Sequence, residues 1–459
     1  MKTPSAVVIL AAGKGTRMKS DLPKVLHPIG GAPMLHHAMR VAGAIAPEIM
    51  AVVVGHGAEK VAAAAKVWNP DTAVALQTEQ LGTGHAVLSA REALTDFDGD
   101  LYVLFGDTPF IRPETLVAMQ AARTGADIVA LGFEAADPGK YGRFILGDDL
   151  ELKAIFEAKD ATPEQLDIRV CNSGLMAGDC RKMLALLDSV RNDNAQGEYY
   201  LTDLIALARA DGLTCKAVMC DEAETLGIND RVQLAEAEAI FQRQMRVDAM
   251  REGATLTAPE TVFFALDTKL GRDVLVHPNV VFGTGVTVGD HCEIKAFSHI
   301  EDTTLAPDVK VGPFARLRGG NDLASGVRIG NFVELKNATL GEGTKAGHLS
   351  YLGDAELGAK VNVGAGTITC NYDGFLKHKT MVGDNAFVGV QTALIAPIQV
   401  GNGAYIGTGT TLTKDVPDDA LALSRVPQQN RDGFAPRLRE KFAAKKALRN
   451  QASSKKETG

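Results

Sequence analysis

The chain has 459 residues, more than one compact core usually holds, so two or more domains are expected. Hydrophobic residues make up 46% and charged residues 23%, as in an ordinary soluble protein, and the net charge of −8 argues against nucleic acid as the main partner. The first residues carry too short an apolar run for a signal peptide or membrane span, and the six cysteines form no CxxC pair, so we expect a cytoplasmic protein without a disulfide framework or zinc site.

Short aliphatic runs alternate with amphipathic stretches from Ser5 to about Gly227. A continuous aliphatic run is typical of a strand that is buried on both faces. Such runs occupy Ala6–Leu10, Ala51–Val54, Leu101–Phe105 and Ile128–Leu131, and a helical pattern such as Pro33–Met39 lies between them. This alternation predicts a mainly parallel, doubly wound, Rossmann-like α/β sheet, which we assign to residues 1–229.

A glycine-rich loop follows the first predicted strand, with the sequence Leu10-Ala11-Ala12-Gly13-Lys14-Gly15-Thr16-Arg17-Met18 and then Pro23-Lys24. Glycine lets the backbone approach a phosphate, and Arg17 and Lys24 can neutralise a triphosphate as charge develops on it. The loop lacks the Gly-Lys-Ser/Thr ending of a P-loop, and Met18 stands where a dinucleotide fingerprint has its third glycine.

Further polar motifs are spread through the same half. Gly106-Asp107-Thr108-Pro109 follows an apolar strand, which places Asp107 at the end of the strand where ligands bind in such sheets. Read alone, Asp107 fits a turn-forming residue as well as a metal ligand. The other motifs are Gln77, Gln80-Leu81-Gly82-Thr83-Gly84, Tyr141-Gly142-Arg143, Glu157, Asn172-Ser173-Gly174 and Gly227-Ile228-Asn229.

Residues 230–252 are rich in Ala, Glu, Gln and Arg and contain no Gly or Pro, which predicts a long linker helix that ends at Gly253. Beyond it aliphatic residues recur every six positions, as in Val276, Phe282, Val288, Ile294 and Ile300. Six is a multiple of two, so these side chains can point the same way from successive short strands, while glycine allows sharp corners. The repeat predicts roughly eight coils of a parallel β-helix over residues 253–459.

Reactive side chains interrupt the repeat at Arg316-Leu317-Arg318, Lys336, His348-Leu349-Ser350-Tyr351 and the out-of-period loop Cys370-Asn371-Tyr372-Asp373-Gly374. A loop that projects from a regular solenoid is where function concentrates. Acetylation of an amine needs a base, and imidazole titrates near working pH, so His348 is the natural candidate, although one histidine in a coil is often structural. Basic residues gather near the end, from Arg437 to Lys446, where a solvated tail is the alternative.

The motifs of the first half resemble the signature of nucleoside-diphosphate-sugar pyrophosphorylases. That resemblance implies Mg²⁺ held by Asp107 and Asn229, a sugar held by Glu157 and Asn172, and catalytic roles for Arg17 and Lys24. The implied contacts to the UDP-sugar come from Leu10, Ala11, Gly13, Lys24, Gln77, Gly82, Thr83, Gly142, Glu157, Asn172 and Asn229.

The repeat resembles the hexapeptide-repeat acyltransferases, whose helix is left-handed. Together with Gly347–Asp354 and Asn362–Gly374, the chain over nearly its whole length resembles the bacterial bifunctional N-acetylglucosamine-1-phosphate uridyltransferase/glucosamine-1-phosphate acetyltransferase family. This implies acetyl transfer from acetyl-CoA to glucosamine-1-phosphate, then uridyl transfer from UTP to N-acetylglucosamine-1-phosphate with release of pyrophosphate, in UDP-N-acetylglucosamine synthesis. It also implies a homotrimer with small-molecule substrates and no nucleic-acid or membrane partner.

The same resemblance makes His348 the base of acetyl transfer. The residues that it implies for glucosamine-1-phosphate are Arg318, Lys336, Tyr351, Asn362, Asn371 and Lys377, and those for acetyl-CoA are Asn371, Tyr372, Thr408 and Arg425, with the basic tail near the coenzyme A phosphates. Two positions depart from the family pattern: Gly319 stands where Pro is usual, and Val390 replaces a usual Ser at the acetyl end of the site.

Two other functions are open at this point. A single-function sugar nucleotidyltransferase could carry a β-helix that only oligomerises or senses effectors, but such a helix would not need His348 beside Tyr351. A non-catalytic scaffold would have no reason to keep Arg17, Lys24, Asp107 and Asn229 together.

Overall fold

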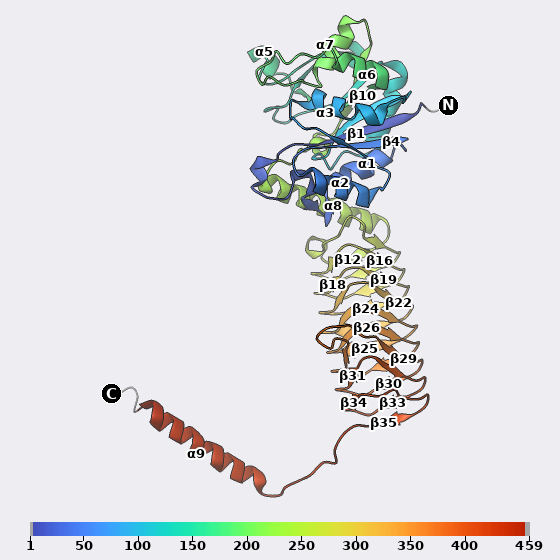
Figure 1. The fold of residues 1–459 in the computed structure, drawn as a ribbon, viewed down its shortest axis with the longest axis vertical. Helices are drawn as coiled ribbons and strands as arrows, with labels where there is room; N and C mark the ends of the chain where they lie inside the picture. The colour runs from blue at the N-terminus through green and yellow to red at the C-terminus, as the bar shows by residue number, and fades with distance from the viewer. Residues whose placement is uncertain (1–2, 455–459) are drawn as a thin grey trace. The chain divides into compact units, whose positions relative to one another are not determined.

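The computed structural model, drawn in Figure 1, describes residues 3–454. The chain divides into two compact units, Met1–Gly320 and Asn321–Gly459. No helix in this described range is both long enough and apolar enough to cross a membrane. The domain boundaries drawn from the sequence pattern, at 229 and 253, stay a prediction.

A mainly parallel sheet forms the core of the first unit. In spatial order its strands are β11 (Cys215–Cys220), β7 (Ile128–Glu134), β10 (Val170–Asp179), β6 (Asp100–Phe105), β1 (Ser5–Ala11), β4 (Ile49–Val54) and β5 (Ala73–Leu76). Four of these strands are the aliphatic runs that the sequence predicted. β10 runs antiparallel to both neighbours, and the hairpin of β8 (Arg143–Leu146) and β9 (Leu152–Phe156) joins it.

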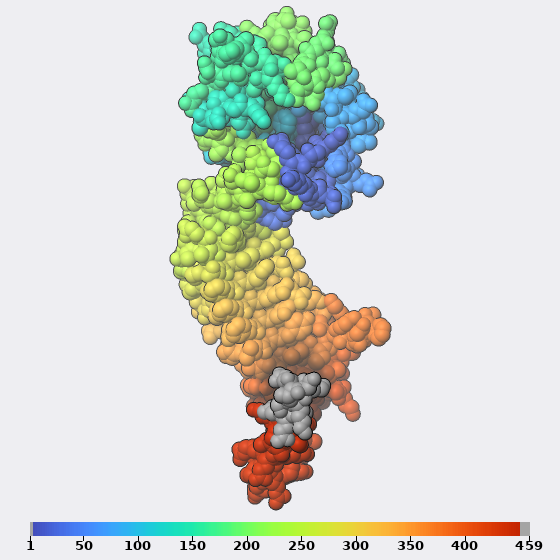
Figure 2. All heavy atoms as spheres, turned by 90° about the vertical axis from the view of Figure 1, so that its left-hand side faces the viewer, coloured from blue at the N-terminus to red at the C-terminus, as the bar shows by residue number. Residues whose placement is uncertain are grey.

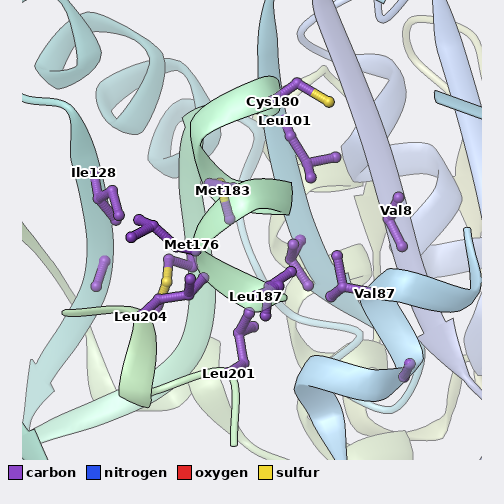
Figure 3. Close-up of a cluster of buried hydrophobic side chains, with 14 of the residues drawn as sticks. Val8, Val87, Leu101, Ile128, Met176, Cys180, Met183, Leu187, Leu201 and Leu204 are labelled. Atoms are coloured by element: carbon purple, nitrogen blue, oxygen red, sulfur yellow. The ribbon is translucent and has the colours of Figure 1, made fainter. Parts of the chain in front are cut away.

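Helices cover both faces of this sheet, because successive side chains of each buried strand point to opposite faces. Ala6 and Val8 of β1 pack into one core with helices α3 (Thr83–Ser89), α6 (Cys180–Leu187) and α7 (Asp203–Ala210), part of which Figure 3 shows. Val7 and Ile9 pack into another core with α1 (Met34–Gly43), α2 (Ala58–Trp68) and α4 (Pro113–Ala122). The doubly wound α/β architecture is confirmed.

The helix expected between the two sequence patterns is α8 (Arg231–Arg251). Its first turn is capped by the Asp230 carboxylate, which accepts hydrogen bonds from two backbone N–H groups, each at 2.9 Å. Farther along, the buried Gln242 side chain exchanges two hydrogen bonds with the backbone of Phe264, at 2.7 and 2.8 Å. This helix is therefore fixed to the chain that enters the first coils.

Short parallel strands stack into coils in both units. One face carries β12 (Thr255–Leu256), β14 (Leu275–Val276), β17 (Glu293–Ile294) and β20 (Lys310–Val311) in the first unit. In the second unit it carries β23 (Arg328–Asn331), β25 (Lys345–His348), β27 (Asn362–Val363), β30 (Phe387–Val388), β33 (Tyr405–Ile406) and β35 (Leu421–Ala422). Partners lie about 18 residues apart, as Leu275 and Glu293 do. The aliphatic residues of the six-residue period are buried, which confirms the parallel β-helix.

The out-of-period loop leaves the coils after β28 (Ile368–Cys370). It is closed by a bridge between Tyr372 and Lys377, and its tip residue Phe375 is 91% exposed. In Figure 2 an orange bulge stands out from the coils at this level. The basic residues of the predicted tail lie on an exposed helix, α9 (Phe434–Ser454).

Candidate active sites

A cavity of about 220 Å³ opens at the carboxyl ends of β1 and β6 in the first unit. Eight of the residues predicted to bind nucleotide or metal line it: Leu10, Ala11, Gly13, Lys24, Gln77, Gly82, Thr83 and Asp107. The space beside Gly13 is open, with no atom within 4 Å of the point where a side chain would begin. A ligand can therefore approach this backbone closely, as the glycine-rich sequence predicted.

The segment from Gln77 to Thr83, which was predicted to contact the UDP-sugar, forms one wall of the cavity. The buried Gln77 amide donates to the Gly82 carbonyl at 3.2 Å and to Nδ1 of His85 at 3.1 Å. Gly82 has φ 112°, and a side chain there would come within 2.6 Å of the Tyr199 carbonyl. Thr83 accepts a hydrogen bond from the Leu201 N–H at 3.0 Å. The loop is therefore held in one shape before any ligand binds.

Four of the predicted catalytic and metal-binding side chains meet at the edge of the cavity. The Lys24 ammonium forms an ion pair with Asp107 and donates to Asn229 Oδ1 at 3.2 Å, and Arg17 donates to the same oxygen at 2.8 Å. The Asn229 amide nitrogen donates to the Gly227 carbonyl at 3.2 Å, which turns its oxygen toward the two cations. The backbone fixes this meeting, because the Ile228 N–H donates to the Asp107 carbonyl at 3.1 Å.

The contacts of Asp107 and Asn229 show whether these two predicted ligands could hold a divalent cation. The Lys24 ammonium lies against one carboxylate oxygen of Asp107 and the amide oxygen of Asn229, and the Asn229 oxygen also accepts from Arg17, so both oxygens already face positive charge. No group of three or more His, Cys, Asp or Glu side chains gathers to hold a metal within the described range. Mg²⁺ commonly takes one or two protein oxygens and completes its shell with phosphates and water. Asp107 and Asn229 fit that ion only together with a nucleotide.

Of the two residues predicted to hold the sugar, Glu157 lines a second cavity of about 750 Å³. Thr202, which the sequence did not single out, donates to the Glu157 carboxylate at 3.0 Å. Burial raises the pKa of this carboxyl, although the Thr202 hydrogen bond opposes the shift. The Asn172 N–H donates to the Gly142 carbonyl at 2.8 Å. These two residues, both predicted to contact the UDP-sugar, are therefore neighbours.

In the second unit, His348 lies at the end of β25 opposite Asn331 at the end of β23. Its Nδ1 is 2.8 Å from Asn331 Oδ1. An amide oxygen can only accept, so Nδ1 carries the proton and Nε2 is left as the basic nitrogen. His348 is exposed, as a base that meets a substrate must be.

Asp354 organises the side chains predicted to bind the sugar phosphate. It accepts hydrogen bonds from Asn337 and Asn371 and lies 3.9 Å from the Lys336 ammonium. Burial raises the pKa of its carboxyl, but these hydrogen bonds and the Lys336 charge outweigh burial and hold the pKa below its usual value. Lys336 in turn lowers the pKa of its neighbour Lys377. Two adjacent cations of this kind favour an anionic ligand such as a phosphate.

A column of corner residues connects His348 with the predicted acetyl-CoA residues. Strand registers place Asn331, His348, Ala365, Val390 and Thr408 one above another in successive coils. Neighbouring N–H groups confirm the register, because Gln391 donates to the Ala365 carbonyl at 2.7 Å and Gly409 to the Val390 carbonyl at 2.8 Å. Three coil steps of about 4.8 Å place Thr408 about 14 Å from His348.

The far end of this column carries a positive charge. The Arg425 guanidinium donates to the Thr408 carbonyl at 3.0 Å. An extended thioester with an anionic end can therefore lie along the column, with its reactive carbon near His348 and its charge near Arg425.

Comparison with known families agrees with both halves of the architecture. A model of the MobA-like NTP transferase domain matches residues 7–165. Models of the bacterial transferase hexapeptide and of the hexapeptide repeat of succinyl-transferase match residues 267–302 and 379–414.

Full-length relatives decide the family. Proteins named "Bifunctional protein GlmU" are 57% identical in Ruegeria sp. strain TM1040, covering 97% of this chain and 99% of the relative, and 54% identical in Roseobacter denitrificans, covering 99% and 100%. The relative from Jannaschia sp. strain CCS1 is 50% identical over 98% of each chain. The chain belongs to the GlmU family. GlmU membership confirms the predicted bifunctional enzyme, a uridyltransferase joined to an acetyltransferase.

One solved structure is also similar to the chain. It is a UDP-glucose pyrophosphorylase complexed with UDP-glucose, with a TM-score of 0.44 and 20% sequence identity, and the match covers 53% of this chain and 99% of that one.

Other residues predicted from the GlmU resemblance lie as follows. Asn362 is exposed on β27, opposite Lys345 in the strand register. Tyr351 lies over Gly353, where a side chain would meet its hydroxyl at 2.3 Å. Tyr372 lies in the projecting loop, where its hydroxyl donates to the Gly374 carbonyl at 2.6 Å. Arg318 belongs to the first unit, on β21 (Arg316–Arg318).

Sequence reasoning missed three residues that the GlmU geometry brings into the sites. Thr202 has no sequence signal that separates it from other helix-capping threonines. Asn331 and Asp354 each had such a sequence signal, which is their spacing. Asn331 lies close to one coil length before His348, and Asp354 lies the same distance before Asn371. Coil periodicity thus indicates which polar residues become neighbours.

Proposed function

We propose that the first unit forms UDP-N-acetylglucosamine from UTP and N-acetylglucosamine-1-phosphate. The observation that carries this proposal is the convergence of Lys24, Arg17, Asp107 and Asn229 beside the cavity lined by Gln77 and Gly82. A phosphate oxygen of the sugar phosphate attacks the α-phosphorus of UTP, the bond to the β-phosphate breaks, and pyrophosphate leaves. Lys24 and Arg17 neutralise the charge that this step places on the triphosphate.

Asp107 and Asn229 would hold Mg²⁺ as the cation of this reaction. When bound, it would supply charge neutralisation and a fixed orientation for the triphosphate oxygens. Lys24 then gives up its ion pair with Asp107 and turns to the phosphates. Glu157 and Asn172 hold the sugar, with the Glu157 carboxylate oriented by Thr202.

The second unit acetylates glucosamine-1-phosphate in our proposal. His348 Nε2 takes a proton from the substrate ammonium, and the freed amine attacks the thioester carbon of acetyl-CoA. The carbon–sulfur bond breaks, and the coenzyme A thiolate takes this proton from the imidazolium, while the second proton that the nitrogen loses as the amide forms passes to solvent. Lys336 and Lys377 bind the sugar phosphate with Arg318, Tyr351, Asn362 and Asn371, while Thr408 and Arg425 line the path of acetyl-CoA and Tyr372 lies near the reacting groups.

We propose the domain organisation that the sequence pattern predicts. Residues 1–229 carry out uridyl transfer, residues 230–252 form the linker helix, and residues 253–459 carry out acetyl transfer. We also propose a cytoplasmic homotrimer, in which the basic face of α9 meets coenzyme A phosphates. Light scattering at several protein concentrations tests the trimer.

Two assays on one preparation test the proposed function. The first follows pyrophosphate release from UTP and N-acetylglucosamine-1-phosphate, with and without Mg²⁺. The second follows thiol release from acetyl-CoA and glucosamine-1-phosphate. We expect turnover in both. Pyrophosphate release without thiol release would instead support a single-function nucleotidyltransferase with a structural β-helix.

A further inference from the structure

The first residue of α8 contacts two separate segments of the nucleotide-binding half. The Arg231 guanidinium donates through Nε to the Met18 carbonyl at 3.2 Å and through Nη1 to Nδ1 of His27 at 3.3 Å. Met18 ends the short helix that carries Arg17, and His27 directly follows the one that carries Lys24. One side chain therefore bridges the two segments that present the catalytic cations.

The contact with Arg231 defines the protonation state of the His27 imidazole. A guanidinium can only donate, so Nδ1 of His27 accepts and its proton lies on Nε2. Burial lowers the pKa of His27, and the Arg231 charge lowers it further. The imidazole therefore stays neutral at working pH, as this contact requires.

The glycine-rich loop needs such a fixed point because its glycines give the backbone freedom. Gly15 and Lys19 flank the short helix with φ values of 56° and 48°, in the left-handed region, which glycine adopts readily and lysine rarely. A loop that contains Gly13 and Gly15 loses conformational entropy when its cations are aligned on a phosphate. A contact that aligns them beforehand lowers that cost.

α8 holds the same part of the chain at a second point. Glu238 accepts a hydrogen bond from the Gly30 N–H at 2.8 Å, and Phe241 packs so closely on Gly30 that a side chain there would come within 2.1 Å of its ring. Gly30 lies in the turn between β2 (Pro28–Ile29) and β3 (Ala32–Pro33), three residues after His27. The orientation of Arg231 is therefore set by the helix, not by an isolated contact.

We propose that Arg231 is a positioning residue for uridyl transfer, which holds the segments of Arg17 and Lys24 in the geometry that meets the triphosphate. The proposal rests on the proposed function of the first unit. It also assigns α8 a role in the reaction beyond joining two domains.

The test compares Arg231→Met, Arg231→Lys and the control Arg243→Met in the full-length protein. Methionine keeps an unbranched stem and helix propensity but has no donor. Arg243 is exposed on the same helix, so its variant reports the effect of charge loss alone. For Arg231→Met we expect kcat of uridyl transfer to fall about tenfold to a hundredfold. In the same variant we expect KM for UTP to rise and KM for the sugar phosphate to stay near wild type. Arg231→Lys keeps one contact, so its rate should lie between those of the wild type and Arg231→Met.

Added methylguanidinium should restore part of the uridyl rate in Arg231→Met and leave Arg243→Met unchanged, which a purely structural role would not produce. Acetyl transfer measured on the same samples should stay at the wild-type rate. Near-normal kcat and KM in Arg231→Met would overturn the proposal, as would an equal fall in both activities with a lower unfolding midpoint. Absence of uridyl transfer in the unmodified protein would instead refute the proposed function itself.

Discussion

At the scale of single residues, Lys24 has two alternative partners. Its ammonium neutralises the Asp107 carboxylate and donates to Asn229, whose amide oxygen also accepts from Arg17. In the function proposed above, the same ammonium meets the phosphates of the nucleotide. Lys24, Arg17 and Asp107 together leave the cluster with one net positive charge, which favours an anionic ligand.

Asp107→Ala tests this arrangement. The variant removes the anionic ligand that we propose for the metal, so we expect uridyl transfer to fall on the order of a thousandfold. Acetyl transfer should stay near wild type, because distant sites rarely couple. The check is both assays on one preparation, with circular dichroism as the folding control. Equal loss of both activities in a folded variant would assign Asp107 a structural role.

His348→Ala should remove most acetyl transfer and leave uridyl transfer intact. A placed general base contributes roughly a hundredfold to ten-thousandfold. Since a substrate amine that is already deprotonated needs no base, raising the pH should recover part of the lost rate in the variant and add little to the wild type. Near-normal acetyl transfer at neutral pH in the folded variant would refute the assignment.

Asn331→Asp changes the same imidazole without removing it. A carboxylate beside Nδ1 stabilises the imidazolium and raises the His348 pKa. The base must be deprotonated to act, so a raised pKa moves the acidic limb of the acetyl-transfer profile to higher pH. The profile of kcat/KM against pH measures this shift, and Asn331→Ala, which adds no charge, is the control. A shift to lower pH, or none, would contradict the contact with Nδ1.

At the scale of elements, the column of corner residues from His348 to Thr408 lies along one side of the coils. In the proposed function, extended acetyl-CoA binds along it. Val390 stands between His348 and Thr408 in this column and is 44% exposed. The register places Val390 two coil steps from His348 and one from Thr408, so in the proposed function it lies along the path of acetyl-CoA. Its side chain has no hydrogen-bonding group, so it cannot donate to a thioester.

Val390→Trp should therefore block acetyl-CoA. We expect KM for acetyl-CoA to rise at least tenfold, because an indole fills space that the thioester arm needs, while KM for glucosamine-1-phosphate changes little. Ile395→Trp, at an exposed position of β31 (Ala393–Ile395), is the matched control and should behave like the wild type. Initial rates over a range of both substrates distinguish the two variants. Equal effects from both would mean that the column does not guide acetyl-CoA.

The coils were predictable because their signal is local and periodic, and each buried residue repeats at a fixed spacing. The cavity residues from Leu10 to Asp107 were predictable because contiguous motifs sit at strand ends. Contacts such as Arg231 with Met18 were not, since they join residues far apart in the chain whose meeting depends on packing. The antiparallel β10 was missed because its run of small and polar residues between Cys171 and Leu175 hides the strand pattern.

At the scale of the whole molecule, most of the residues proposed for each reaction belong to one compact unit. Lys24, Arg17 and Arg231 belong to the first unit, and His348, Lys336 and Lys377 belong to the second, while Arg318 of the proposed acetyl-transfer site belongs to the first. Coils of a solenoid contact only their neighbours, so removal of later coils leaves earlier ones largely intact. α8 lies wholly within the first unit, together with the coils that it contacts.

Two truncated chains test this organisation. A chain ending at Gly320 keeps α8 and its contacts with Met18, His27 and Phe264, so we expect uridyl transfer within about threefold of the full-length rate, without acetyl transfer. A chain ending at Asn229 keeps every predicted nucleotide-binding residue but loses the helix that orients them. It should retain some uridyl transfer, at a rate at least tenfold lower than that of the full-length protein, because the positioning contacts are lost. Circular dichroism and the unfolding midpoint must show that both fragments fold. Full activity in the shorter fragment would mean that α8 only joins the two halves, and loss of activity in the longer one would mean that the first unit depends on the later coils.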